Sequence, residues 1–246
     1  RLVGSEMCIR DSYQRCQEYL LEPVVLNMSD TLFRMAGERQ DERMQAVAIA
    51  TQLDYYYFQG TNEDSVIHYT NKVKEFAKAT HQPKYYYFAW ANRLITYYLK
   101  TSRTNIALYE VQNMLKEAQE EDDKTGLSRC YNIMSQIYTI KRFDSMAFEW
   151  RLKEIELTEK YKIENYNISQ TYAQIANYYI NQKKQKEALA AVEKAIATAN
   201  SSTQQISAKL EFVNYYSKFG DFQAAEKLLK ECQAAFEQDK RLESIK

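Results

Sequence analysis

The stretch YAQIANYYINQKKQKEALAAVEKAI, residues 172–196, decides the fold of this chain. Apolar and small side chains recur in it at three- and four-residue spacing on both sides of a polar break at residues 181–186. That spacing places each set on one face of a helix, so the stretch predicts two helices joined by a short turn. The members are Tyr172, Ile175, Ala176 and Tyr179 before the break, and Ala188, Val192, Ala195 and Ile196 after it.

The same arrangement recurs along the chain. A tyrosine is followed nine residues later by a small or β-branched residue five times, and both series advance by 41, 40, 41 and 37 residues. A constant step of this size is typical of stacked helical hairpins. The tyrosines are Tyr57, Tyr98, Tyr138, Tyr179 and Tyr216, and their partners are Val66, Ala107, Ala147, Ala188 and Ala225.

Composition supports an all-α chain and argues against a nucleic-acid partner and a membrane-spanning segment. The 246 residues include only five Gly and two Pro, which is little punctuation for a strand-and-turn protein. Lys plus Arg and Asp plus Glu number 33 each, so no general field attracts nucleic acid, and we expect no nucleic-acid partner. No apolar run approaches the roughly 18 residues that a membrane span needs, so no membrane segment is predicted in this chain.

The hairpins resemble the tetratricopeptide repeat (TPR), which has aromatic and small residues at these places. The resemblance covers residues 44–240 and implies a right-handed superhelical α-solenoid of antiparallel hairpins. The usual unit has roughly 34 residues, so a step near 40 implies about one extra helical turn per hairpin. A related hairpin array with longer helices is therefore an alternative to the TPR itself.

The predicted domain organisation follows from the repeats. Helices within residues 13–43 cap the N-terminal end, and residues 239–246 form a C-terminal connector. Residues 1–12, RLVGSEMCIRDS, resemble translated sequencing-adapter read-through, so we expect them to be non-native and the true N-terminus to be missing. The five hairpins are expected at about 44–82, 84–122, 125–162, 165–200 and 203–238.

No residue pattern predicts catalysis. His68 and His81 lack a partnered Cys, Asp or Glu constellation, and the scattered glycines cannot form a phosphate-binding loop. Three widely separated cysteines remain outside residues 1–12, without disulfide or zinc spacing. We therefore predict a non-enzymatic protein without catalytic residues, cofactor or metal.

Two aromatic clusters, residues 55–58 and 85–88, each place four rings around a helix. The rings cannot all face one core, so some line helix interfaces while others reach a groove or solvent. Packing between helices and contact with a partner both remain open for them.

Amide and hydroxyl side chains fall at first-helix positions that point into the concave groove of this repeat class. Amides both donate and accept hydrogen bonds, so they suit the backbone of an extended peptide. The carboxylate-clamp subgroup of TPR proteins binds the C-termini of chaperones through lysines and asparagines. Those lysines are absent at the corresponding positions here, which excludes a chaperone C-terminus as the partner. The candidate groove residues are Asn92, Thr96, Asn132, Gln136, Asn177, Asn181 and Asn214.

Residues 85–100, YYYFAWANRLITYYLK, and residues 113–118, NMLKEA, resemble the N-terminal sensory regions of Bacteroidetes-type signalling proteins, namely histidine kinases or DNA-binding regulators. That resemblance implies a bacterial sensor whose output domain follows Lys246. Our first hypothesis is a scaffold that binds a protein or extended peptide. The alternative is a structural module that self-assembles into a homo-oligomer. The sensor resemblance implies a periplasmic location, and without it we expect a cytoplasmic one.

Overall fold

A computed structural model describes residues 5–238. Residues 1–4 and the predicted connector at 239–246 lie outside the described part. The chain divides into two compact units, residues 1–133 (unit 1) and 134–246 (unit 2), with the boundary inside helix α8. Between residues 5 and 238 the chain contains helices and connecting turns but no strand.

The helical elements lie in the following order along the chain. The first nine elements are α1 (Ser5–Glu18), α2 (Val24–Gly37), α3 (Glu42–Gln59), α4 (Glu63–Ala79), α5 (Pro83–Tyr87), the π-helix η1 (Phe88–Ile95), α6 (Thr96–Lys100), α7 (Thr104–Glu120) and α8 (Lys124–Ile140). The remaining five are α9 (Asp144–Tyr161), α10 (Ile168–Asn181), α11 (Gln185–Ala197), α12 (Ser202–Phe219) and α13 (Phe222–Gln238).

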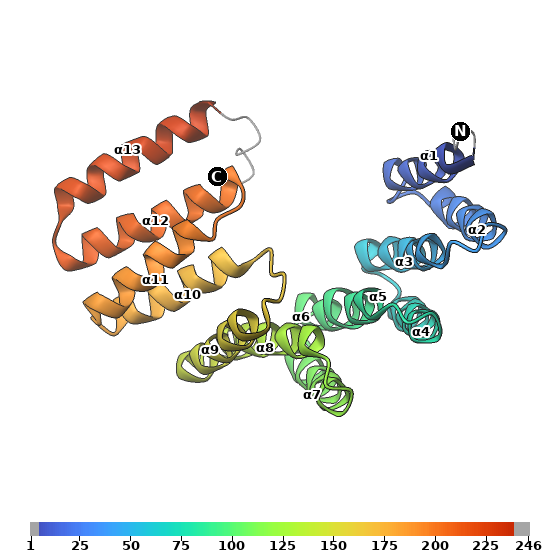
Figure 1. Cartoon of the computed structure of the whole chain (residues 1–246), viewed down its shortest axis with the longest axis horizontal. Coiled ribbons are helices and arrows are strands. Elements are labelled where there is room, and N and C mark those ends of the chain that lie inside the picture. Colours follow the sequence, from blue (N-terminus) through green and yellow to red (C-terminus); the bar gives the residue numbers. More distant parts are fainter. Residues whose placement is uncertain (1–4, 239–246) are drawn as a thin grey trace. The chain divides into compact units, whose positions relative to one another are not determined.

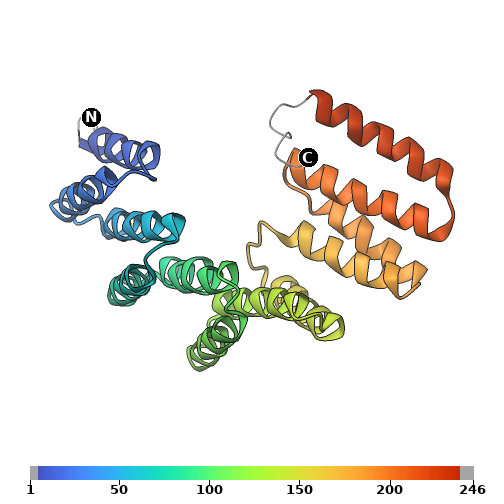
Figure 2. The ribbon, with the colours of Figure 1, turned by 180° about the vertical axis from the view of Figure 1, so that it is seen from behind.

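Within each unit, helices that are neighbours in the chain pack against each other. In unit 2, α10 packs on α11 and α12 packs on α13 (Figures 1 and 2). Both α10 and α11 also contact α12, so one hairpin packs on the next. In unit 1, α4 packs on α3 and also on η1, which repeats this pattern.

The turns of the second to fifth hairpins explain the nine-residue spacing of the sequence. In the fourth hairpin, the Lys184 N–H donates to the Tyr179 carbonyl at 2.9 Å, which closes α10 five residues after the tyrosine. The Ala188 N–H then donates to the Lys184 carbonyl at 2.9 Å, which is the first helical bond of α11, four residues further on. Five plus four residues give the observed nine. The same pair of bonds joins Tyr98 to Ala107, Tyr138 to Ala147 and Tyr216 to Ala225.

A left-handed residue allows the chain to reverse in these turns. It lies four residues after the tyrosine, with φ of 60° at Ser102, 64° at Arg142, 57° at Lys183 and 92° at Gly220. This is the backbone conformation with which many helices end. Only Gly220 adopts it without the steric cost of a Cβ atom.

The small residues of the repeat lie where the two helices of a hairpin meet. Val66, Ala107, Ala147, Ala188 and Ala225 are all buried. In unit 2, Ala188, together with Val192 of α11, belongs to one apolar cluster with Tyr172 and Ile175 of α10. A small side chain at this position lets the backbones of the paired helices approach closely.

The first helix of the second hairpin departs from regular α geometry. Its central eight residues form η1, and the Thr96 hydroxyl donates to the carbonyl of Ala91, five residues earlier. In the aromatic cluster at residues 85–88, Tyr86 and Tyr87 are buried. In the cluster at residues 55–58, Tyr57 is buried while Phe58 is exposed. In both clusters, some rings are thus buried between helices while others remain accessible to solvent.

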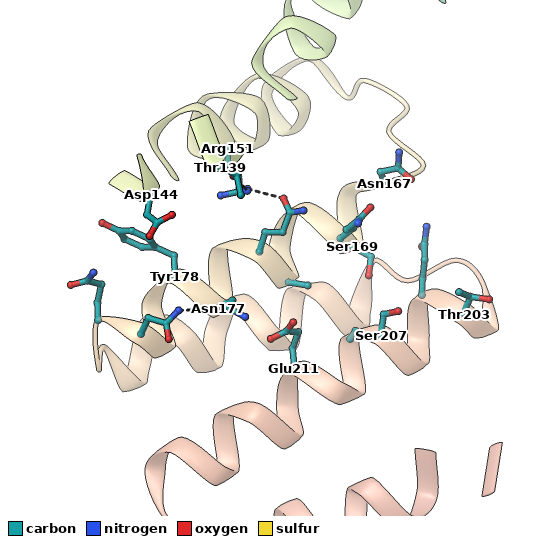
Figure 3. A pocket seen from close by; sticks show the side chains of 17 residues that line it. Thr139, Asp144, Arg151, Asn167, Ser169, Asn177, Tyr178, Thr203, Ser207 and Glu211 are labelled. Atoms are coloured by element: carbon teal, nitrogen blue, oxygen red, sulfur yellow. Dashed lines mark hydrogen bonds between the residues drawn. The ribbon is translucent and has the colours of Figure 1, made fainter. Parts of the chain in front are cut away.

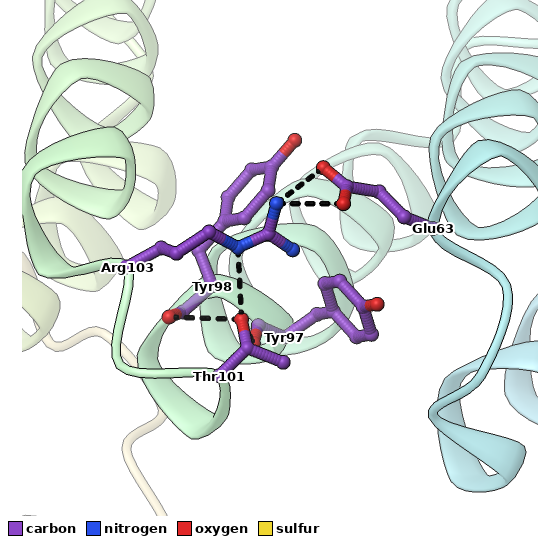
Figure 4. A network of polar contacts seen from close by, with 5 residues as sticks. All are labelled: Glu63, Tyr97, Tyr98, Thr101 and Arg103. Atoms are coloured by element: carbon purple, nitrogen blue, oxygen red, sulfur yellow. Dashed lines mark hydrogen bonds and ion pairs between the residues drawn. The ribbon is translucent and has the colours of Figure 1, made fainter.

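Polar contacts also join successive hairpins of unit 1. Arg103, just before α7, donates from Nη1 to both carboxylate oxygens of Glu63 at 2.6 and 2.7 Å (Figure 4). Its guanidinium also lies over the rings of Tyr97 and Tyr98, and its Nε donates to Thr101 Oγ1 at 3.1 Å. Arg103 therefore links the start of α4 to the turn between α6 and α7.

At the N-terminal end, α1 begins at Ser5, inside residues 1–12, the segment that we expected to be non-native. The helix packs on its neighbour, because Ile9 is buried in a cluster with Cys16, Val25 and Leu32. Between residues 5 and 238, none of the helices is both long enough and apolar enough to cross a membrane.

Candidate functional site

Unit 2 contains a polar cavity of about 610 Å³ between the first helices of its successive hairpins (Figure 3). Helices α10 and α12 form most of its wall, and α8 and α9 close one side. Most of the side chains that line it carry an amide, a hydroxyl or a charge. They are Thr139, Asp144, Arg151, Asn167, Ser169, Gln170, Ala173, Gln174, Asn177, Tyr178, Asn181, Gln182, Thr203, Gln204, Ser207, Ala208 and Glu211.

Helical spacing positions the amides of α10. Gln170, Gln174, Asn177 and Asn181 are separated by four, three and four residues, so they form one stripe along the helix. The apolar side chains of α10 pack on α11 instead, which leaves the amide stripe toward the cavity. One helix thus contributes both the core of its hairpin and a wall of the site.

A chain of hydrogen bonds orients the amides at one end of the cavity. Asn181 Nδ2 donates to Asn177 Oδ1 at 2.9 Å, and the Asn177 side chain in turn bonds to Glu211 of α12. Asn214 Nδ2 also donates to Glu211, at 3.5 Å. Burial raises the pKa of Glu211, and the bonds from Asn214 and Asn177 oppose that rise only in part.

Arg151 of α9 occupies another part of the cavity wall. Its Nε donates to Gln174 Oε1 at 2.7 Å and its Nη2 to Thr139 Oγ1 at 2.8 Å. The Thr139 hydroxyl donates its own hydrogen bond to the Ser135 carbonyl, at 2.8 Å. Because Gln174 points its oxygen at Arg151, its Nε2 remains as a donor to a ligand.

Small and aromatic residues provide the apolar part of the cavity. Ala173 and Ala208 line it without long side chains, so a ligand can approach the backbone of α10 and α12 closely. Tyr178 stacks on Phe148 with ring centroids 4.0 Å apart and an interplanar angle of 14°. The stacked ring is a rigid apolar surface beside the polar stripe.

The chemistry of this wall suits an extended peptide. A peptide in an extended conformation has unpaired backbone N–H and C=O groups along its length, and both must be satisfied when it leaves water. Amides supply donors and acceptors from one side chain, so successive amides along α10 can satisfy both kinds of group. A single charged side chain cannot do so, since Lys and Arg only donate and ionised Asp and Glu only accept.

The structure brings some of the predicted groove residues together and separates others. Asn177 and Asn181 line the cavity, and Asn214 lies next to it through its bond to Glu211. Asn132 is half-buried and Gln136 exposed on α8, and neither lines this cavity. Asn92 and Thr96 belong to unit 1, where Thr96 uses its hydroxyl within its own helix.

Asn92 lies close to a second, smaller cavity of about 240 Å³ in unit 1. Arg129 lines that cavity and donates from Nη1 to Asn92 Oδ1 at 2.7 Å. Arg93 of η1 forms an ion pair with Asp54, which also lines the cavity, at 2.5 Å. In unit 1 the predicted asparagine is therefore engaged by an arginine of the protein itself.

Several residues of the unit 2 cavity were missed by the sequence reasoning. Gln170 and Gln174 share the helical stripe of Asn177 and Asn181, so extending the three- and four-residue spacing backwards would have found them. Arg151 and Glu211 had no such signal, because a single charge in a helix of this class is usually a solvated surface residue.

Comparisons with known proteins bear on the fold. No protein-family model matches the chain, and no curated protein does. Among solved structures, the apo form of RapI matches with a TM-score of 0.67 and 12% identity, over 99% of this chain and 67% of RapI. BtubC (BKLC) from P. vanneervenii matches with a TM-score of 0.58 and 13% identity, over 94% of this chain and 89% of BtubC.

A third match is a structure of nearly identical TPR-like repeats of kinesin light chain type from Podosopora anserina. Its TM-score is 0.50 at 11% identity, over 97% of this chain and 99% of that one. At such low identities these structures establish the fold alone. The chain is a TPR-like array of helical hairpins, which confirms the fold class predicted from its sequence.

Proposed function

We propose that this protein is a scaffold that binds an extended peptide, or an extended segment of a protein, in the cavity of unit 2. The support is the stripe of amides on α10 facing α12, in a cavity of about 610 Å³. Binding would release water from Ala173, Ala208 and Tyr178 while the amides pair with the peptide backbone.

We further propose that the chain is the sensory or interaction region of a bacterial signal-transduction protein. The support is the resemblance of residues 85–100 and 113–118 to such regions. In a hairpin array each hairpin contacts mainly its neighbours. A ligand between α10 and α12 would therefore act first on the adjacent hairpin α12–α13. A downstream output domain would then receive the signal through the C-terminal helix.

A pool of randomised nonapeptides, N-acetylated and C-amidated, tests the binding proposal. The pool is passed over the immobilised protein, and the retained peptides are identified by mass spectrometry and titrated singly by fluorescence anisotropy. We expect the Asn177→Ala, Asn181→Ala double variant to weaken binding about tenfold or more, because two hydrogen-bonding amides are lost. Helicity by circular dichroism should be unchanged.

The matched control replaces two exposed amides of α13, Gln223→Ala with Gln233→Ala, which lie outside the cavity. It should bind like the wild type. No retained peptide, or equal affinity in both double variants, would refute the proposal. A sedimentation experiment that found a concentration-independent oligomer and no retained peptide would favour the self-assembly alternative.

A further inference from the structure

Arg151 is the residue of the unit 2 cavity that the amide stripe does not explain. It is only 8% exposed, yet it lines the cavity. Both groups that its guanidinium contacts, Gln174 Oε1 and Thr139 Oγ1, are neutral. Within residues 5–238 it forms no ion pair at hydrogen-bonding distance.

The carboxylates near Arg151 compensate its charge incompletely. Burial lowers the pKa of Arg151, and Glu154 and Asp144 oppose that effect without reversing it. Glu154 is itself buried and accepts a bond from Asn165 at 3.0 Å, while Asp144 is exposed to solvent. An arginine side chain does not give up its proton in a protein, so it cannot relieve the cost of burial by becoming neutral.

We propose that Arg151 binds a carboxylate of the peptide held in this cavity. The planar guanidinium is suited to a carboxylate, and the bond would be charge-assisted in a poorly hydrated site. The inference rests on the proposed function and adds the chemical class of ligand, a peptide with an acidic side chain or a free C-terminus. This cation comes from α9, a second helix of its hairpin, and so differs from the first-helix lysines whose absence excludes a carboxylate clamp.

Peptide pools with one fixed central residue test the inference. Two pools of N-acetylated, C-amidated heptapeptides differ only in that residue, which is Glu in one and Gln in the other. We expect the wild-type protein to retain the Glu pool about tenfold better than the Gln pool, since bonds to charged groups are the stronger ones. Arg151→Gln should lose this preference, and Arg151→Lys should keep part of it because the charge remains.

The control is Lys153→Gln, which removes an exposed positive charge from the same helix and should leave the preference intact. A third pool, with Gln at the centre and a free C-terminal carboxylate, separates the two sources of the carboxylate. If only that pool shows the dependence on Arg151, the terminus is the group recognised. A preference for acid that survives in Arg151→Gln, or no preference in the wild type, overturns the inference.

A small probe distinguishes failure of the Arg151 inference from failure of the peptide-binding proposal. N-acetylglutamate α-amide and its glutamine counterpart are compared at equal concentration by thermal unfolding. Arg151→Gln should fold, because the substitution removes a buried charge and retains an amide that can bond to Thr139. We expect only the glutamate probe to raise the Tm of the wild type, and neither probe to raise that of Arg151→Gln. Equal shifts in both proteins, or none in either, would refute a carboxylate site whether or not peptides bind.

Discussion

Lys183 and Gly220 occupy the same position in two successive hairpin turns but differ in backbone strain. Both have positive φ, 57° and 92°, and only the lysine has a Cβ atom that crowds its own backbone there. We predict that Lys183→Gly raises the free energy of unfolding by about 0.5–1 kcal/mol and that Gly220→Ala lowers it by about 1 kcal/mol. Urea unfolding measures both.

The surroundings of Gly220 leave room for the added methyl group of Gly220→Ala. Apart from Gly220 itself and its neighbours in the chain, no atom lies within 4 Å of a Cβ added there, so the cost of the alanine is conformational. Two substitutions that changed the free energy of unfolding in the same direction would show that the turn is not left-handed at this position.

Glu211 predicts a pH dependence of stability. Its pKa is raised by burial, so the folded protein holds this proton more tightly than the unfolded chain does. Its contribution to stability is therefore present at low pH and is lost as the pH rises through the folded pKa. We predict that Glu211→Gln is more stable than the wild type at neutral pH and that the gain vanishes below about pH 4.3, the ordinary pKa of glutamate.

Chemical denaturation at a series of pH values checks this prediction. Glu193→Gln, which removes an exposed carboxylate from α11, is the matched control and should follow the wild type throughout. A gain for Glu211→Gln that did not depend on pH would contradict the burial of an ionised carboxylate.

At the scale of the element, the register of the hairpin α10–α11 depends on Ala188. It is fully buried against α10, whereas Ala190, two residues later, is exposed on the same helix. We predict that Ala188→Trp lowers the free energy of unfolding by at least about 1–3 kcal/mol because the added ring overpacks the helix interface. Ala190→Trp should change it little. A pair of variants with the same Tm would mean that the helices pack with different faces.

The hairpins could be predicted from the sequence because their signal is local. The spacing between Tyr179 and Ala188 reflects two backbone bonds within one turn, and these depend on neither distant contacts nor a ligand. The π-helix η1 could not be predicted in this way. Its residues are as apolar and aromatic as an α-helix of the same array would require, and the wider turn appears only in the packed structure.

At the scale of the whole molecule, the candidate site was predictable in part. Asn177 and Asn181 were found because first-helix positions of such arrays face a groove. Asn92 shows why the same rule is incomplete, since it lies in unit 1, bonded to Arg129, and does not line the unit 2 cavity. Arg151 could not be found from the sequence, because its burial depends on how α9 and α10 pack, not on its own neighbours in the chain.

Photo-crosslinking tests the central claim most directly. A peptide retained from the randomised pool is resynthesised with a photoreactive side chain at each position in turn, irradiated on the full chain, and its adducts are mapped by mass spectrometry. We predict adducts on the cavity faces of α10 and α12, at residues such as Gln174, Asn177 and Ser207. Adducts confined to α11 and α13, or spread over both units without preference, would contradict a peptide-binding groove in unit 2.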